Sequence, residues 1–282
     1  MAFATTKKSV LRSVFAAIAV AATIALAACS NSAAPSTSDL QTVTAGKLTI
    51  GTGQPAYEPW VVGDKPESGE GFEAAVAYAV AAELGYAKKD VVWVRTTFDE
   101  AIAPGVKNFD FNLQQYSITD ERKKNVDFSS PYYSTTQTVI TIAGSKADGV
   151  TTVAGLKGLV IGAATGTTSY NAIGDVIQPT SAAQAFNSND DAVAALKSGQ
   201  IDALVVDLPT ALYLTAVELD GGKIVGQLSG STAGDQFGLV LDKGSSLTAK
   251  VTAAVDALRA NGTLAKLETK WLADYANAPV LK

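Results

Sequence analysis

Residues 111–133 read FNLQQYSITDERKKNVDFSSPYY. Within this stretch, Thr119 followed by Asp120 and Glu121 is typical of a helix N-cap with acidic residues in the first turn. Arg122 then lies beside backbone N–H groups that have no partner inside the helix. Such N–H groups favour an anion and Arg adds a bidentate fork, so this stretch can bind a carboxylate. Arg122 is also the first of three consecutive basic residues, and a solvated helix face is the alternative.

Strand and helix patterns alternate along the chain from Lys47 onward. Short apolar runs predict strands at 47–52, 90–95, 137–143, 159–163, 201–207 and 236–241. Helical spacing places Phe72, Val76, Val80 and Leu84 on one face before Gly85, and Leu247, Val251, Val255 and Leu258 on another before Gly262. Ser188 and Asp191 resemble a capping box of a helix that ends at Gly199. This alternation predicts an α/β fold with mostly parallel sheets.

The composition excludes several kinds of site. The chain of 282 residues has no histidine and one cysteine, so it has no Ser-His-Asp or Cys-His nucleophilic site, no HExxH zinc site and no internal disulfide. The phosphate-binding GxxxxGK[ST] motif and the GxSxG motif are absent as well. A formal net charge of −5 argues against nucleic acid as the main partner. We therefore expect no metal, no cofactor and no nucleic acid.

The first residues resemble a secretory signal. Residues 1–12 carry three basic residues and no acid, and the apolar run at 13–28 is shorter than the roughly twenty residues of a membrane-spanning helix. This run ends in Leu26-Ala27-Ala28-Cys29, which resembles the bacterial lipobox and implies that residues 1–28 are removed and Cys29 is acylated. Residues 29–45 are small and polar and predict a flexible tether. A transmembrane anchor and a free buried thiol are the alternatives.

The stretch 111–133 is similar to the signature of the family 3 extracellular solute-binding proteins, the polar amino-acid receptors of ABC importers. Their pattern S-x-T-x-x-R-x-x-x-[VI]-x-F-[ST]-x-x-Y is matched by Ser117, Thr119, Arg122, Val126, Phe128, Ser129 and Tyr132. Further family motifs follow in order along nearly the whole chain: Tyr57-Glu58-Pro59-Trp60, Gly71-Phe72-Glu73, Phe98-Asp99, Gly166-Thr167-Thr168, Gly199 with Ile201-Asp202-Ala203 and Asp207, and Lys270-Trp271. Their order and spacing together make the resemblance specific.

The resemblance implies a two-lobed, type II periplasmic-binding-protein-like fold. Lobe 1 is expected to comprise 46–136 and 234–282, lobe 2 to comprise 137–233, and two hinge strands to join them. Closure of the lobes around an amino acid would make the chain a receptor that serves an ABC permease and ATPase. The implied location is outside the cytoplasm, anchored to the cell membrane through Cys29, and the implied state is a monomer.

The resemblance also implies how the two charged ends of the ligand are bound. Arg122 is expected to bind the α-carboxylate together with Ser117, Thr168 and the adjacent Thr167. Asp207, at the end of a predicted strand, is expected to accept from the α-ammonium. The alternative for Asp207 is that it only caps the helix that follows.

The ligand side chain is expected to lie among aromatic and amide groups. Tyr57 and Phe98 match the family's aromatic pair that flanks it, although Phe98 could also be an ordinary core residue. Gln114 and Gln115 are expected near the side-chain pocket, and Trp60 either lines it or packs in the core.

Gly53 bears on the choice of ligand. Family receptors for basic amino acids often carry an acid at its position, so a polar ligand such as glutamine is slightly favoured, with basic and acidic ligands left open. Glu58 could replace the missing acid. The alternative function is an enzyme of the prephenate or arogenate dehydratase type on the same fold, and the amino-group acceptor Asp207 favours a binding protein over it.

Overall fold

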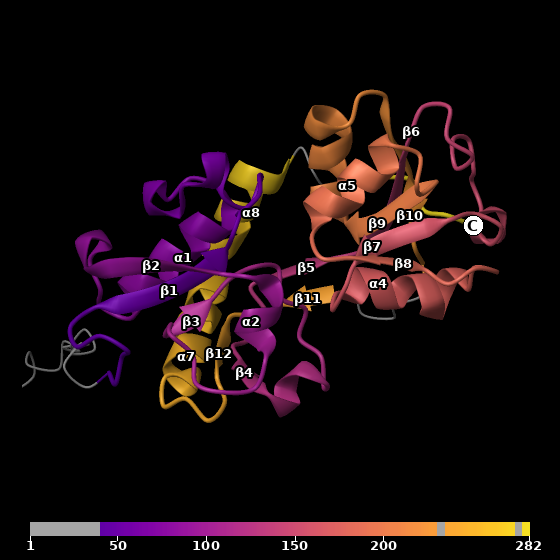
Figure 1. Ribbon diagram of the computed structural model, residues 1–282. Helices are drawn as coiled ribbons and strands as arrows, with labels where there is room; N and C mark the ends of the chain where they lie inside the picture. The colour runs from indigo at the N-terminus through magenta and orange to yellow at the C-terminus, as the bar shows by residue number, and fades with distance from the viewer. Residues whose placement is uncertain (1–39, 230–234, 274–277) are drawn as a thin grey trace, which may run out of the picture. The chain divides into compact units, whose positions relative to one another are not determined.

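Two five-stranded sheets form the framework of the computed structural model, which describes residues 40–229, 235–273 and 278–282 (Figure 1). All of these residues belong to one unit, Pro35–Lys282. The predicted signal sequence and Cys29 lie outside the described residues. Among the helices that the structure describes, none is long and apolar enough to cross a membrane.

The first sheet has the strand order β2-β1-β3-β12-β4. Its strands are β1 (Leu48–Gly53), β2 (Val91–Thr96), β3 (Phe111–Asn112), β4 (Val126–Phe128) and β12 (Val240–Asp242). Strand β1 is parallel to β2 and β3, whereas β12 is antiparallel to β3 and β4.

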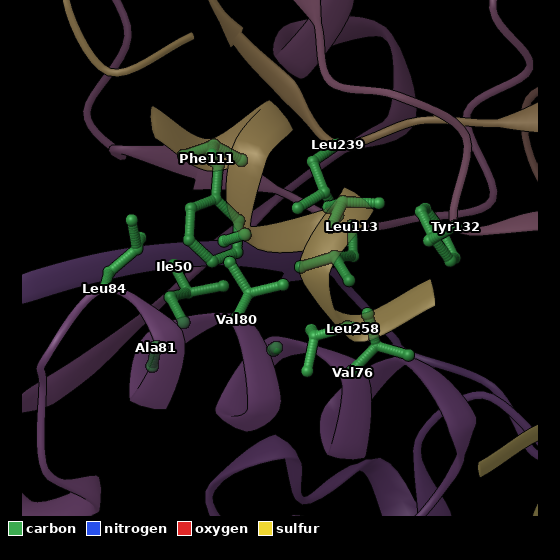
Figure 2. Close-up of a cluster of buried hydrophobic side chains, with 14 of the residues drawn as sticks. Ile50, Val76, Val80, Ala81, Leu84, Phe111, Leu113, Tyr132, Leu239 and Leu258 are labelled. Carbon is green, nitrogen blue, oxygen red and sulfur yellow. The ribbon is translucent and has the colours of Figure 1, made fainter. Parts of the chain in front are cut away.

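A hydrophobic core joins the first sheet to three helices. These are α1 (Phe72–Glu83), α7 (Thr248–Ala260) and α8 (Thr263–Leu272). Figure 2 shows side chains from several of these elements gathered in the core, among them Ile50, Val80, Phe111 and Leu258. The apolar faces predicted for α1 and α7 are fully buried here, which confirms both.

The second sheet has the strand order β10-β6-β9-β7-β8. Its strands are β6 (Gln137–Ile142), β7 (Ile161–Ala164), β8 (Gln184–Phe186), β9 (Ala203–Asp207) and β10 (Gly222–Gln227). Strand β7 is parallel to β8 and β9, whereas β6 is antiparallel to β9 and β10. In each sheet four of the five strands run in the same direction, so the sheets are mostly parallel, as predicted. The strands β6 and β12, each of which follows the connection between the two sheets, run against their neighbours.

Helices and short turns connect the strands. The remaining helices are α2 (Phe98–Ile102), α3 (Val153–Leu156), α4 (Thr168–Ala172), α5 (Asn189–Lys197) and α6 (Leu208–Tyr213), with π-turns at Ile173–Ile177 and Leu214–Glu218. The 3-10 turns lie at Val62–Asp64, Pro66–Ser68, Lys88–Asp90 and Arg122–Lys124. Ser188 caps α5 as predicted, since its hydroxyl accepts from the Asp191 amide at 3.1 Å.

Two short antiparallel strands connect the sheets (Figure 1). They are β5 (Tyr133–Thr135) and β11 (Asp235–Phe237). The sequence predicts a single strand at 236–241, but the structure divides it into β11 and β12. The division falls at Gly238, where a Cβ atom would lie 2.8 Å from the Ile118 side chain and 3.1 Å from that of Phe128. The chain changes pairing partner at this close approach.

At both ends of the described chain, the structure differs from the lobe and tether boundaries that the sequence predicts. Residues 278–282 contact the second sheet, because the Gln227 amide donates to the Pro279 carbonyl at 2.7 Å and Leu281 is buried in that sheet's core. They thus lie outside the lobe to which the sequence-based boundary assigns them. Leu40, within the predicted tether, is buried in the core of the first sheet. The ordered body therefore begins before residue 46.

Candidate ligand-binding site

One cavity of about 230 Å³ is lined by residues from both sheets. Its wall includes all ten residues that the sequence predicts for the site: Tyr57, Trp60, Phe98, Gln114, Gln115, Ser117, Arg122, Thr167, Thr168 and Asp207. Most of them lie on loops at strand ends or at the first residue of a helix. The two connecting strands bring together groups that lie up to about 150 residues apart in the sequence, as Trp60 and Thr210 do.

Arg122 is 8% exposed and bonds to both halves of the wall. Its Nη1 donates to the Ser117 carbonyl at 2.8 Å, and its Nη2 donates to the Gly166 carbonyl at 2.9 Å. The guanidinium also lies over the Phe98 ring, 5.2 Å from its centre. Burial lowers the pKa of Arg122, whereas negative neighbours that include Asp235 and Asp207 act in the opposite direction.

The helix predicted around Arg122 is a single 3-10 turn, Arg122–Lys124. Thr119 does cap this turn, because its hydroxyl accepts from the Arg122 amide at 3.1 Å. The turn ends at once because the chain must enter β4 at Val126. So short a turn supplies little helix dipole. The prediction that a helix N-terminus contributes to anion binding here is therefore wrong. The anion-binding capacity of this stretch rests on the guanidinium.

Three hydroxyl groups lie near the guanidinium. The Ser117 and Thr168 hydroxyl oxygens are 3.1 Å apart, and the Thr168 hydroxyl donates to Asp235 Oδ2 at 2.7 Å. Thr167 caps α4, accepting from the Tyr170 amide at 3.1 Å while donating to the Ala164 carbonyl at 2.6 Å. The Thr167 side chain is thus engaged in the turn that presents Thr168 to the cavity.

Asp207 ends β9 and precedes α6, but its side chain makes no capping bond to that helix. Its Oδ1 accepts from Gln137 Nε2 at 2.9 Å. Gln137 Nε2 also donates to Asp235 Oδ2. Loss of water around Asp207, reinforced by the Asp235 carboxylate, raises the pKa of Asp207 to about 8. A cation brought beside this carboxylate would be strongly attracted to the ionised form.

The predicted aromatic residues have different surroundings. The Phe98 and Tyr116 rings lie 4.6 Å apart at 34°, and Phe98 remains half-buried at the cavity wall. Tyr57 is also half-buried, and burial together with Asp190 of α5 raises its pKa well above its usual range. Trp60 is 1% exposed, so both expectations for it apply: it lines the cavity, and it packs in the core with the rings of Phe72, Tyr133 and Phe237.

The two predicted glutamines are engaged with other side chains. Gln114 Oε1 accepts from the Tyr116 hydroxyl at 2.8 Å. Gln115 has a positive φ of 53°, and both its backbone amide and its side-chain amide donate to the buried carboxylate of Glu73. The Tyr132 hydroxyl donates to Glu73 as well. Gln115 is therefore held by Glu73 and is less free than Gln114 to turn toward a ligand.

Several polar residues in or beside the cavity wall were not predicted for the site, among them Gln137, Asp235 and Thr210. Gln137 and Asp235 lie beside Thr168 and Asp207, and Thr210 accepts from Trp60 Nε1 at 3.2 Å. Thr210 follows the predicted residue Asp207 by one helical turn, and this spacing could have indicated that Thr210 lies near the site. Asp235 matches no motif, and only the three-dimensional pairing of β5 with β11 brings it near Thr168.

Two further features concern the ligand's charge. The wall holds Gly53 at the position where family receptors for basic amino acids often carry an acid, and Gln54 and Gln114 also line the wall. A Cβ at Gly53 would lie 2.9 Å from Gln114 Nε2. Glu58 does not line this cavity, and its Oε1 accepts from the Gly63 amide at 3.1 Å. Among the described residues, no cluster of acidic side chains could hold a metal ion.

A sequence profile of the bacterial extracellular solute-binding proteins, family 3, matches residues 48–274, and the chain belongs to this family. It is similar to the L-arginine-binding protein of Pseudomonas aeruginosa, 32% identical over 224 residues covering 77% of this chain and 84% of that protein. It is also similar to the ABC transporter glutamine-binding protein GlnH of Bacillus subtilis, 31% identical over 212 residues covering 73% of this chain and 75% of that protein.

A solved structure gives the same result for the fold. An ancestral arginine-binding protein bound to glutamine matches with a TM-score of 0.67 and 32% identity, covering 81% of this chain and 98% of that one. The fold is thus the expected two-lobed, type II fold. The relatives named here are binding proteins and not enzymes, so the chain is a solute-binding protein and the dehydratase alternative is less well supported.

Proposed function

We propose that this chain binds a free amino acid in the cavity between its two sheets and delivers it to an ABC importer. The observation that carries this proposal is the placement of Arg122 and Asp207 in one cavity wall, on elements of different sheets. A zwitterion is the ligand that uses a guanidinium and a carboxylate at once. Relatives that bind arginine or glutamine support an amino-acid ligand.

In this proposal, Arg122 binds the α-carboxylate and Asp207 binds the α-ammonium. The guanidinium carries more N–H donors than the carbonyls of Ser117 and Gly166 use, so donors remain for a ligand. Ser117 and Thr168 add hydroxyl groups at the carboxylate end, next to the turn that Thr167 caps.

The ligand side chain would lie between Tyr57 and Phe98, with Gln114 as a polar partner and Trp60 at the wall. A polar or charged amino acid fits these groups. Glutamine and arginine are the two candidates to test first, because the relatives are named for them.

The mechanism we propose is hinge closure. The lobes would be 40–136 with 235–273 and 137–229 with the C-terminal residues 278–282, and β5 and β11 would serve as hinge strands. A ligand that bridges Arg122 and Asp207 binds the closed form better than the open one, and it therefore shifts the population toward closure. The closed form is what a permease would recognise, with the chain acting as a monomer.

We further propose that Cys29 is the lipidated first residue of the mature chain. Two or three acyl chains at about 0.8 kcal/mol per buried CH₂ would hold the protein on the membrane, with the residues between Cys29 and Leu40 as the tether. Replacement of Cys29 by Ala should move the protein from the membrane fraction to the soluble fraction. Retention of the Cys29→Ala protein in the membrane fraction would contradict this part of the proposal.

A thermal-shift screen of the mature protein over the common amino acids tests the central claim. A ligand that binds the native state raises the unfolding midpoint by mass action, so one or a few amino acids should raise it. Arg122→Ala should abolish the shift. Lys124→Ala is the matched control, because Lys124 is an exposed cation on the same 3-10 turn, and it should keep the shift. A flat response of the wild type to every amino acid would contradict the proposal.

A further inference from the structure

Two carboxylates share one amide donor next to the cavity. Asp207 ends β9, Asp235 begins β11 and Gln137 begins β6. Gln137 Nε2 donates to Asp207 Oδ1 at 2.9 Å and also to Asp235 Oδ2. Two oxygens that bond to one nitrogen lie within about 6 Å of each other. At this distance, two negative charges in a partly buried site repel each other strongly.

No cation forms an ion pair with Asp207 or Asp235 in the part of the chain that the structure describes, although Arg122 lies within electrostatic reach of both. The nearest guanidinium, that of Arg122, donates to the backbone carbonyls of Ser117 and Gly166. The one other donor to Asp235 is the neutral hydroxyl of Thr168.

The surroundings of the pair contain more acceptors than donors. Gln137 is 6% exposed, and its Oε1 has no hydrogen-bond partner among the described residues. Both carboxylates fix the orientation of this amide, because Nε2 must face them. The site therefore offers three acceptor groups and lacks the positively charged, multiple donor that would satisfy them. An ammonium group supplies such donors.

The charged and titratable groups that face Asp207 come from several elements. Asp235 on β11 and Glu73 on α1 oppose its ionisation, and Arg122 favours it. Tyr132 and Tyr133, before and in β5, also lie within electrostatic reach of Asp207. Two of the three ionic neighbours are thus acidic, which favours retention of a proton while the cavity is empty.

We propose that the Asp207–Asp235 pair holds one proton in the empty cavity and releases it when the ligand's ammonium group arrives, so that amino-acid binding is coupled to proton release. This inference rests on the proposed function. The carboxyl O–H bond breaks and its proton passes to water, while the ammonium keeps its own protons and donates N–H bonds to the carboxylates. Asp235 acts through Asp207 and is a positioning residue.

Calorimetric titration of the mature wild-type protein with L-glutamine and with L-arginine tests this coupling. Titration at pH 7 in phosphate and in Tris, which differ in ionisation enthalpy, gives the number of protons released. We expect close to one proton per ligand bound. The affinity should rise about tenfold between pH 6 and pH 7 and flatten above pH 8, because Asp207 has a pKa of about 8.

Asp235→Asn separates this role from a purely structural one. The variant should release fewer protons at pH 7 than the wild type, and its affinity should change less between pH 6 and pH 7. Burial, the first cause of the raised pKa of Asp207, remains in the variant, whereas the repulsion by Asp235 is lost. If Asp235 had only a structural role, its replacement would lower the affinity at every pH. The number of protons released and the pH dependence of the affinity would stay as in the wild type. Asp148→Asn is the matched control, since Asp148 pairs with Lys223 away from the cavity, and it should behave as the wild type.

The outcomes also distinguish this inference from the proposed function. Binding of either amino acid without proton release overturns the coupling and leaves the receptor assignment standing. Proton release that is as large in Asp235→Asn as in the wild type also overturns it. Binding of neither amino acid, together with a flat thermal-shift screen, overturns both.

Discussion

Arg122 Nη2 donates to the carbonyl oxygen of Gly166 at 2.9 Å, and these residues lie 44 positions apart in the chain. Gly166 follows β7 of the second sheet, whereas Arg122 precedes β4 of the first. The group proposed to bind the ligand carboxylate therefore already joins the two halves of the cavity wall. In the proposed mechanism, closure and carboxylate binding depend on the same guanidinium.

We predict that Arg122→Lys weakens amino-acid binding about 100-fold or more. Lysine keeps the positive charge but loses the planar fork, so it cannot reach the Ser117 and Gly166 carbonyls and a carboxylate together. Calorimetric titration with the amino acid found in the screen measures this change. A loss of less than threefold would show that charge alone is sufficient at this position.

We predict that Thr210→Val weakens binding by two- to tenfold without lowering the stability of the empty protein. Trp60 Nε1 donates to Thr210 Oγ1 at 3.2 Å, and the two residues lie on elements of different sheets. Loss of one such bond costs about 0.5–1.5 kcal/mol in the closed form, whereas water can satisfy the indole N–H in an open form.

Thr215→Val is the matched control for Thr210→Val. The Thr215 hydroxyl donates to the Ala211 carbonyl at 2.9 Å, within its own half of the protein. Its replacement should leave the ligand affinity unchanged. Equal effects of the two substitutions on affinity would contradict a bridging role for Thr210.

Much of this site could be expected from the sequence because the resemblance to the family assigns roles to residues at fixed places in short motifs. Ser117 and Arg122 belong to one short stretch, and Asp207 ends an apolar strand. The ends of β1, β2, β6, β7 and β9 were also predicted to within about two residues, since these apolar runs are clearly bounded, whereas β3, β4, β5, β8 and β10 were not predicted.

The remainder depends on contacts between distant parts of the chain. Gln137 and Asp235 are 98 positions apart, so no local pattern shows that their side chains meet. The helix expected at Thr119 was wrong because its local capping signal is outweighed by the need to enter β4. The bond between Gln115 and Glu73 likewise appears only when α1 is placed beside the strand ends.

We predict that Gly71→Ala lowers the unfolding free energy by about 3 kcal/mol or more. Gly71 has a φ of 100°, and an added Cβ would lie 2.4 Å from the Trp60 carbonyl oxygen, which is backbone and cannot rotate away. That carbonyl accepts from the amides of Glu73 and Ala74 at the start of α1. Strain and overpacking of this kind each cost about 1–3 kcal/mol.

Gly105→Ala isolates the backbone contribution to that effect. Gly105 has a φ of 113°, and an added Cβ would meet no atom within 4 Å. The unfolding free energy of this variant should fall by only about 1–2 kcal/mol, the cost of a positive φ for alanine. Denaturant unfolding of both variants measures the difference, and equal losses would contradict the steric argument.

We predict that Glu73→Gln removes a pH-dependent loss of stability. Glu73 is 2% exposed, and burial raises its pKa from 4.5 to about 7 despite the hydrogen bonds from Tyr132 and Gln115. An acid with a raised pKa binds more protons in the folded state. The unfolding free energy of the wild type should therefore fall as the pH rises from about 4.5 to about 7, by about 3 kcal/mol from this group. Glutamine cannot ionise, so the variant avoids this part of the fall.

Denaturant unfolding at pH 5 and pH 8 gives the unfolding free energy of the variant and of the wild type, and the effect is the change with pH in the difference between these two values. The unfolding free energy of the variant should be close to that of the wild type at pH 5 and higher by a few kcal/mol at pH 8. In both proteins, ionisation of Asp207 still lowers the unfolding free energy as the pH rises. Glu83→Gln, at the exposed end of the same helix, should show no such change. If the difference between Glu73→Gln and the wild type is the same at both pH values, Glu73 is ionised in the folded protein throughout this range. The three hydrogen bonds that it accepts would then offset the cost of its burial.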